Sequence, residues 1–85
     1  MVAKRQTLGF LAANVRRLRL KHDLTQAQLA EQADISPIHV QRIERGIVDA
    51  RVSTIVALAD ALATTPDKLL RPARAVERRV GRPKG

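Results

Sequence analysis

The chain of 85 residues contains no cysteine, tryptophan or tyrosine, and its single phenylalanine is Phe10. Without cysteine there is no disulfide framework, no thiolate metal site and no thiol nucleophile. With almost no aromatic side chains, we expect a core of Leu, Ile, Val and Ala. No run approaches the ~20 apolar residues that span a bilayer, and the first residues lack the apolar stretch of a signal peptide. These absences predict a small cytoplasmic domain with no membrane partner.

The sequence also lacks a recognisable catalytic constellation. Its Ser and Thr residues read as helix caps, no two acids are paired at a useful spacing, and there is no glycine-rich phosphate loop. We therefore expect no enzymatic activity, no cofactor and no metal. The formal net charge is +8. This excess of positive charge favours a polyanionic partner, with nucleic acid ahead of an anionic membrane, although a basic surface also simply keeps a small protein soluble.

Apolar residues at helical spacing indicate an all-α chain. Residues 1–6 read as a flexible basic arm, and Thr7 is placed to cap a helix that continues to about residue 22. The other side of this helix carries Arg16, Arg17 and Lys21, which form either a solvated face or contacts to a phosphate backbone. The apolar positions follow the i, i+3, i+4, i+7 rule at Leu8, Leu11, Ala12, Val15 and Leu18.

Residues 25–46 have the pattern of two short helices joined by a tight turn. Thr25 and Gln28 form a T-x-x-Q capping box at the start of the first helix. Asp34 stands at the turn, and Asp tolerates the left-handed conformation better than most residues. The buried side of this helix is predicted at Leu29, Ala30 and Ala33.

The second of these helices begins with Ser36 as N-cap and Pro37 at the first helical position, and Gly46 ends it. Val40 and Ile43 give it a narrow buried stripe. A short helix held by its neighbour, with polar and cationic side chains outside, is typical of a helix-turn-helix. The outward side chains are predicted to be those of His39, Gln41, Arg42 and Arg45.

Two further helices are predicted after residue 46. Ile47 or Val48 is expected to pack back onto the core from the loop, and either Ser53 or Asp49 to cap a helix over about 52–63. A last short helix starts at Thr65-Pro66-Asp67 and closes the core with Leu69 and Leu70. The predicted domain therefore spans residues 7–71.

Pro72 ends the regular structure, and residues 72–85 are predicted to be a basic, disordered tail. Residues 71–85 hold six Lys or Arg and one Glu. The Gly-Arg-Pro-Lys run near the end is similar to the core of the AT-hook, a peptide that lays Arg-Pro in a narrow A·T minor groove. Arg79, Arg82 and Lys84 are therefore candidates for minor-groove insertion or for nonspecific phosphate binding.

Five motifs along the chain form a specific combination. They are Val15-x-x-Leu18-Arg19, the LTQAQLA run at 24–30, Ile43-Glu44-Arg45-Gly46, Leu58-Ala59 with Ala61-Leu62, and Leu69-Leu70. In this combination residues 11–70 resemble the Cro/repressor-type helix-turn-helix domain of bacteria and phages. The resemblance implies a compact five-helix bundle that binds double-stranded DNA, regulates transcription in the cytoplasm, at the nucleoid, and acts as a homodimer.

The resemblance also implies roles for individual residues. Arg19 and Glu44 match a partly buried ion pair between the first and third helices, and Gln26 matches a residue that braces the recognition helix. The positions that most often touch base edges are those of Pro37, Ile38 and Arg42, with His39 and Gln41 beside them. The implied phosphate contacts are Gln26, Ser36 and Arg45, and the first helix adds Arg16 and Arg17.

The sequence departs from the family pattern at several of these positions. Pro37 has no N–H to offer a phosphate, and Ile38 can make only apolar contact, for example with a thymine methyl. Hydrogen-bonded readout therefore falls chiefly on Arg42. Asp34 replaces the usual glycine of the inter-helix turn, and Ala50-Arg51 replaces the usual Pro-Ser, which leaves the shape of that loop open.

These patterns predict a sequence-specific, DNA-binding transcriptional regulator, with repression by occupation of a promoter as the expected mode. Two alternatives keep the same fold. In one, the chain is an antitoxin-like module that holds a protein partner through its C-terminal tail and binds DNA secondarily. In the other, it is a basic protein that binds RNA or the ribosome.

Overall fold

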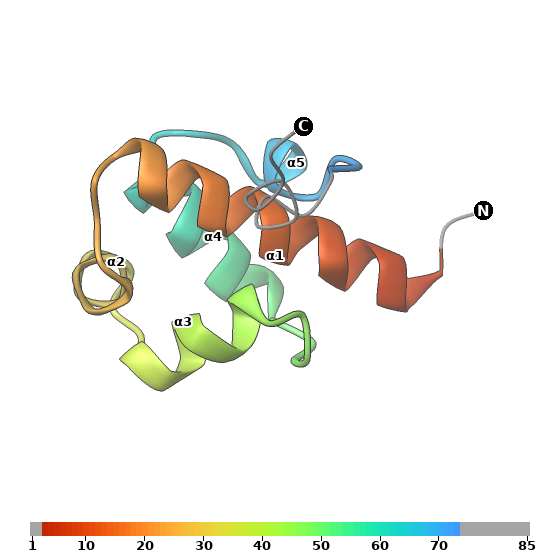
Figure 1. The fold of residues 1–85 in the computed structure, drawn as a ribbon, viewed down its shortest axis with the longest axis horizontal. Helices are drawn as coiled ribbons and strands as arrows, with labels where there is room; N and C mark the ends of the chain where they lie inside the picture. The colour runs from red at the N-terminus through yellow and green to blue at the C-terminus, as the bar shows by residue number, and fades with distance from the viewer. Residues whose placement is uncertain (1–2, 74–85) are drawn as a thin grey trace, which may run out of the picture.

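The computed structural model describes residues 3–73, which form five helices and no strand. The helices are α1 (Lys4–Lys21), α2 (Gln26–Ala33), α3 (Pro37–Glu44), α4 (Val52–Ala61) and α5 (Pro66–Leu69). Figure 1 shows α1 running across the molecule, with α3 on one side of it and α5 on the other. The predicted all-α, five-helix fold is confirmed.

The start of α1 differs from the prediction. The helix begins at Lys4, with Ala3 as N-cap, and Thr7 lies inside it rather than at its end. The backbone N–H of Ala3 donates to Gln6 Oε1 at 3.1 Å. This is the bond that the third helical residue makes in a capping box, and it forms here although the cap residue has no hydroxyl group. Lys, Arg and Gln are also good helix formers. The predicted flexible arm over residues 1–6 is therefore wrong for residues 4–6.

The core is aliphatic, as the lack of aromatic residues predicts. Each helix contributes at least one side chain to it, and Asn14 and Arg19 are the polar residues buried beside them. Among residues 3–73, no helix is of the length and apolar character needed to cross a membrane. The largest fully buried side chains are those of Leu11, Val15, Leu29, Val40, Ile43, Leu58, Leu62 and Leu69.

The caps of α2 and α3 and the turn between these helices have the predicted chemistry. Thr25 Oγ1 accepts from the Gln28 N–H at 3.0 Å, and Gln28 Oε1 accepts from the Thr25 N–H at 2.8 Å. Asp34 ends α2 in the left-handed conformation, with φ 58° and ψ 46°. Ser36 Oγ then accepts from the His39 N–H at 3.2 Å, which caps α3. The bonds at Thr25 fix the start of α2, and the left-handed Asp34 with the Ser36 cap sets the turn from α2 into α3.

The segment after α3 confirms some predictions and corrects others. Val48 packs against the core, whereas Ile47 is 62% exposed. α4 begins at Val52 with Arg51 as N-cap and no side-chain capping bond, so the predicted caps, Ser53 and Asp49, are both wrong. Ser53 lies within the first turn of the helix and Asp49 lies before the cap position.

The last helix ends one residue earlier than the prediction implies. Thr65 is its N-cap and Pro66 its first residue, as predicted. Leu69 is fully buried and closes the core, whereas Leu70 follows the helix and is 36% exposed.

Candidate nucleic-acid interface

α3 divides its residues between an inner and an outer face. Val40 and Ile43 are 0% and 1% exposed, and they attach the helix to the core. Arg42 and Gln41 are exposed, which confirms their predicted outward position, and His39 is half-buried. The remaining predicted readers, Pro37 and Ile38, are also exposed, at the N-terminal end of the helix. The outer face of α3 is therefore accessible to a partner along its length.

A buried ion pair fixes the C-terminal end of α3. Arg19 Nε lies 2.7 Å from Glu44 Oε2, and Arg19 Nη2 donates to Glu44 Oε1 at 3.0 Å. The two side chains are 9% and 3% exposed. Arg19 Nη1 also donates to the Leu24 carbonyl at 2.8 Å. The predicted pair between the first and third helices is thus confirmed, in the bidentate geometry that makes such pairs strong.

Gln26 joins the same network from α2. Its Nε2 donates to Glu44 Oε1 at 3.1 Å, so one carboxylate connects α1, α2 and α3. This confirms that Gln26 braces the third helix. Because Gln26 is the first residue of α2 and is only half-buried, part of its side chain remains accessible beside the outer face of α3.

The basic residues of α1 fall on two sides of that helix. Arg16 lines a cavity of 300 Å³ between α1 and the end of α3, together with Arg45 and Arg5. Arg17 is on the α5 side, where its Nη2 donates to Asn14 Oδ1 at 3.2 Å. The structure therefore brings Arg16 and Arg45 together and separates Arg17 from them.

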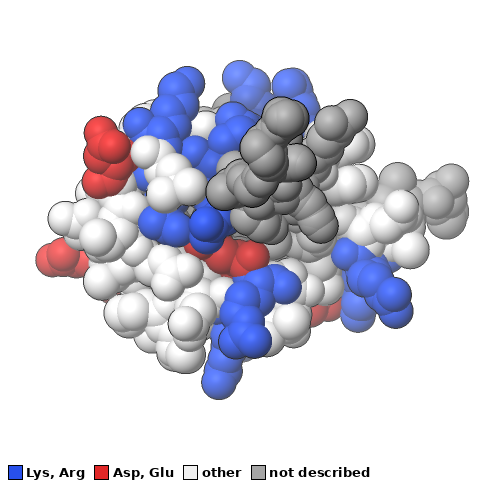
Figure 2. Space-filling model, viewed as in Figure 1, with Lys and Arg blue, Asp and Glu red and all other residues white. Residues whose placement is uncertain are grey.

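A second hollow lies beside the N-terminal end of α3. It measures 410 Å³, and Ser36 and His39 line it together with Asp49, Arg51 and Thr54. Figure 2 shows Lys and Arg side chains at the top, centre, lower centre and right of this view, and acidic side chains in the middle and at the left edge. Arg51 therefore lies in the hollow at the start of α3 together with Asp49, and Arg5, Arg16 and Arg45 line the cavity near its end together with Glu44.

Two basic residues near α3 were missed by reasoning from the sequence. The sequence pattern places Arg5 in a flexible arm, although this residue belongs to α1 and lines the same cavity as Arg16. A helix that includes residue 5 places it on the face of residues 9, 12 and 16, so the missing signal was the start of the helix. Arg51 enters the sequence prediction only as a departure from the family loop, yet it lines the same hollow as His39.

The predicted tail contacts Arg79, Arg82 and Lys84 lie outside the described residues. Within residues 3–73 there is no group of three or more His, Cys, Asp or Glu side chains that could hold a metal ion.

Comparisons with known proteins agree with this geometry. Residues 15–69 match the family model described as helix-turn-helix. Control protein C.SmaI from Serratia marcescens is 40% identical over 60 residues, which are 71% of each chain. The crystal structure of the restriction-modification controller protein C.AhdI from Aeromonas hydrophila is similar with a TM-score of 0.70 and 31% identity, over 73% of this chain and 94% of that chain. A hypothetical transcription factor, NHTF from Neisseria, gives a TM-score of 0.77 and 26% identity, over 94% and 88% of the two chains.

Proposed function

The chain belongs to the helix-turn-helix family of DNA-binding transcriptional regulators, and from this premise we propose that it reads a specific duplex sequence by placing α3 in the major groove. The observation that carries the proposal is the division of α3 into a buried stripe and an exposed face. Val40 and Ile43 hold the helix, while Gln41 and Arg42 face outward. An α-helix presented in this way fits the width of the major groove.

Arg42 carries most of the proposed base recognition. An arginine that donates two hydrogen bonds to guanine discriminates against the wrong base by about 1–3 kcal/mol. Ile38 is 49% exposed and supplies an apolar contact, for example with a thymine methyl group. Gln41 and His39 support Arg42, and Pro37 presents only its ring to the groove.

The sugar-phosphate backbone is held by residues that flank α3. Gln26 and Ser36 lie at the beginnings of α2 and α3, and Arg45 and Arg16 lie near the end of α3. Each phosphate that Arg45 or Arg16 neutralises makes the slope of log K against log salt more negative by about 0.9, whereas Gln26 and Ser36 only donate hydrogen bonds. The phosphate contact predicted for Arg17 requires DNA that reaches past α1, because this side chain is on the α5 side.

The regulator acts as a homodimer on an operator whose half-sites are about one helical turn apart, because helix-turn-helix dimers mirror the symmetry of their sites. It works on the nucleoid in the cytoplasm, where it represses a promoter by occupying it.

The relative C.AhdI is a restriction-modification controller protein. We propose the same class of target promoter for this chain. Fragments of the source organism's genome that are recovered bound to the protein are then expected to include the promoter of a restriction or modification gene. Recovery of other fragments alone would argue against that target.

The test of base reading is a selection of bound duplexes from a random pool, which we expect to return a palindrome. Arg42→Ala is expected to flatten the sequence preference at one position of each half-site while far-UV circular dichroism stays unchanged. Gln26→Ala is the matched comparison, because it is expected to weaken binding to all sites by a similar factor. A preferred site that Arg42→Ala still favours as strongly as the unaltered protein would refute the assignment of Arg42.

A further inference from the structure

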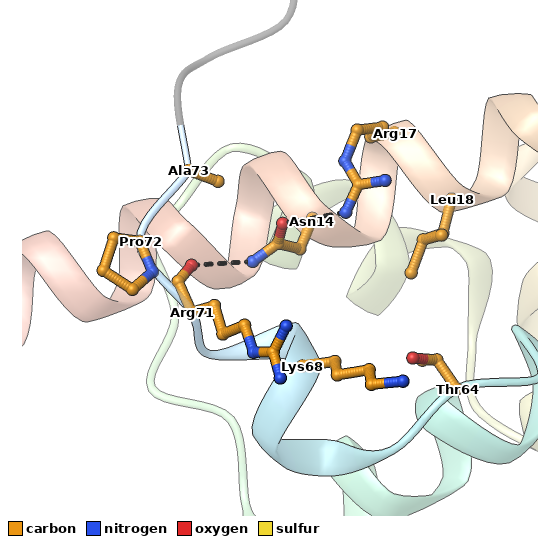
Figure 3. A pocket seen from close by; sticks show the side chains of 8 residues that line it. All are labelled: Asn14, Arg17, Leu18, Thr64, Lys68, Arg71, Pro72 and Ala73. Carbon is orange, nitrogen blue, oxygen red and sulfur yellow. Dashed lines mark hydrogen bonds between the residues drawn. The ribbon is translucent and has the colours of Figure 1, made fainter.

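A cavity lies between α1 and α5, away from α3. It has a volume of 540 Å³, within the range of about 300–1,000 Å³ that small-molecule sites occupy. Figure 3 shows side chains from α1 on one side of it and from α5 and the chain beyond α5 on the other. Its lining residues are Asn14, Arg17, Leu18, Thr64, Lys68, Arg71, Pro72 and Ala73.

The charged groups that line this cavity are all positive. Arg17 comes from α1, Lys68 from α5 and Arg71 from the residues after α5, and none of the described residues that line the cavity is acidic. Within the part of the chain that the structure describes, the acid paired with this group is Asp67, whose Oδ2 is 3.9 Å from Arg71 Nη2. Both of these side chains are more than 60% exposed (64% and 72%), so their pairing offsets little of the positive charge.

Asn14 holds the walls of the cavity in place. This residue is only 2% exposed, and its Nδ2 donates to the carbonyls of both Leu69 and Arg71 at 2.9 Å. Its Oδ1 accepts from Arg17 Nη2 at 3.2 Å. One buried amide therefore fixes the backbone of one cationic residue and the guanidinium of another. Cationic side chains that are preorganised in this way bind an anion at a smaller cost in conformational entropy than mobile side chains do.

The position of the cavity separates it from the proposed DNA contact. α1 packs against α3 on one side and against α5 on the other (Figure 1). A molecule between α1 and α5 therefore leaves the outer face of α3 free.

Arginine and lysine are the side chains that bind phosphate groups most strongly, arginine through two parallel hydrogen bonds and lysine as a point charge.

We propose that this cavity binds a small phosphorylated molecule, with Arg17, Lys68 and Arg71 holding its phosphate and Leu18 contacting its apolar part. The Thr64 hydroxyl offers a further hydrogen bond. This site goes beyond the proposed DNA binding, and it makes the regulator responsive to an anionic effector.

The test is a titration of the full chain with pyrophosphate, followed by amide NMR at constant ionic strength set with chloride. We expect saturable shifts at the side-chain amide of Asn14 and at the backbone amides of Thr64, Lys68 and Arg71. Lys68→Gln is expected to weaken this binding roughly fivefold, the effect of one exposed charge pair. Lys4→Gln removes the same charge about 15 Å along α1 from Asn14, at 1.5 Å per residue, and is expected to leave the affinity within twofold.

Two results would overturn the proposal. The first is shifts that do not saturate, or that Lys68→Gln and Lys4→Gln reduce equally, because binding would then reflect only the net charge. The second comes from titration with an operator duplex. If DNA moves the same amides and excludes pyrophosphate, the cavity is a contact for backbone phosphate. If DNA binding is intact and pyrophosphate still saturates the site, the effector cavity is supported separately from the DNA interface.

Discussion

Arg19→Met is the substitution that most directly tests how α3 is held in place. It leaves the Glu44 carboxylate, which is 3% exposed, with the Gln26 amide as its one remaining hydrogen-bond partner within residues 3–73. It also removes the donor to the Leu24 carbonyl. Breaking a buried ion pair from one side costs about 3–5 kcal/mol, whereas an exposed pair contributes about 0–1 kcal/mol. We therefore expect the free energy of unfolding to fall by about 3–5 kcal/mol.

Such a loss is large for a chain of this size. At about 0.05–0.15 kcal/mol per residue, 85 residues have a total stability of about 4–13 kcal/mol. Each kcal/mol lowers Tm by about 4–8 °C in a domain of this length, so the expected decrease is about 12–40 °C. Urea unfolding followed by far-UV circular dichroism measures the free energy, and a thermal scan measures Tm.

Lys21→Met is the matched control, because Lys21 is an exposed cation on the same helix. It is expected to change stability by less than about 0.5 kcal/mol. The double variant Arg19→Met with Glu44→Met removes both charges, so it is expected to cost less than the sum of the two single changes. A cost for Arg19→Met no larger than that for Lys21→Met, or simple additivity in the double variant, would refute the reasoning.

Three further changes have defined outcomes. Gly9→Ala is expected to raise the free energy of unfolding by up to about 1 kcal/mol in a urea titration, because an added Cβ meets nothing within 4 Å and alanine favours the helix; a loss of stability would show that this part of α1 is not helical in solution. Asn14→Leu leaves two carbonyls without their donor, and is expected to cost about 1–3 kcal/mol in thermal unfolding; no loss would mean that the amide is not the clamp. A hydrogen bond from the Thr65 side chain holds the pKa of the Asp67 carboxyl below its usual value of 3.8. The stability that this carboxylate contributes is therefore present above pH 3.8 and lost as the pH falls through its lower folded-state pKa, so Asp67→Asn is expected to make unfolding in acid less steep, and identical acid transitions would argue against the bond.

The local signals of the sequence predicted most of the fold. The capping box at Thr25, the left-handed Asp34 and the Ser36-Pro37 start of α3 are all decided by neighbouring residues, so the pattern is sufficient to find them. The start of α1 was missed because its cap comes from Gln6, a side chain three residues inside the helix. The start of α4 was missed because it has no side-chain cap at all.

The site was predictable in part for the same reason. The outward position of Arg42 follows from helical periodicity, and the pair of Arg19 with Glu44 follows from the family resemblance. The role of Asn14 does not follow from either. Its partners, Leu69 and Arg71, are 55 and 57 residues away in the chain, and contacts at that separation depend on how the helices pack.

The arrangement of α3 has a consequence for how such a regulator changes its target over time. The groups that secure the helix are Val40, Ile43 and Glu44, and all three point away from solvent. The exposed positions, such as Ile38 and Arg42, make no contribution to the core. On the proposed reading of DNA by α3, substitutions there are expected to change the recognised promoter while leaving the scaffold intact, so a family built on this scaffold is free to diversify its operators one side chain at a time.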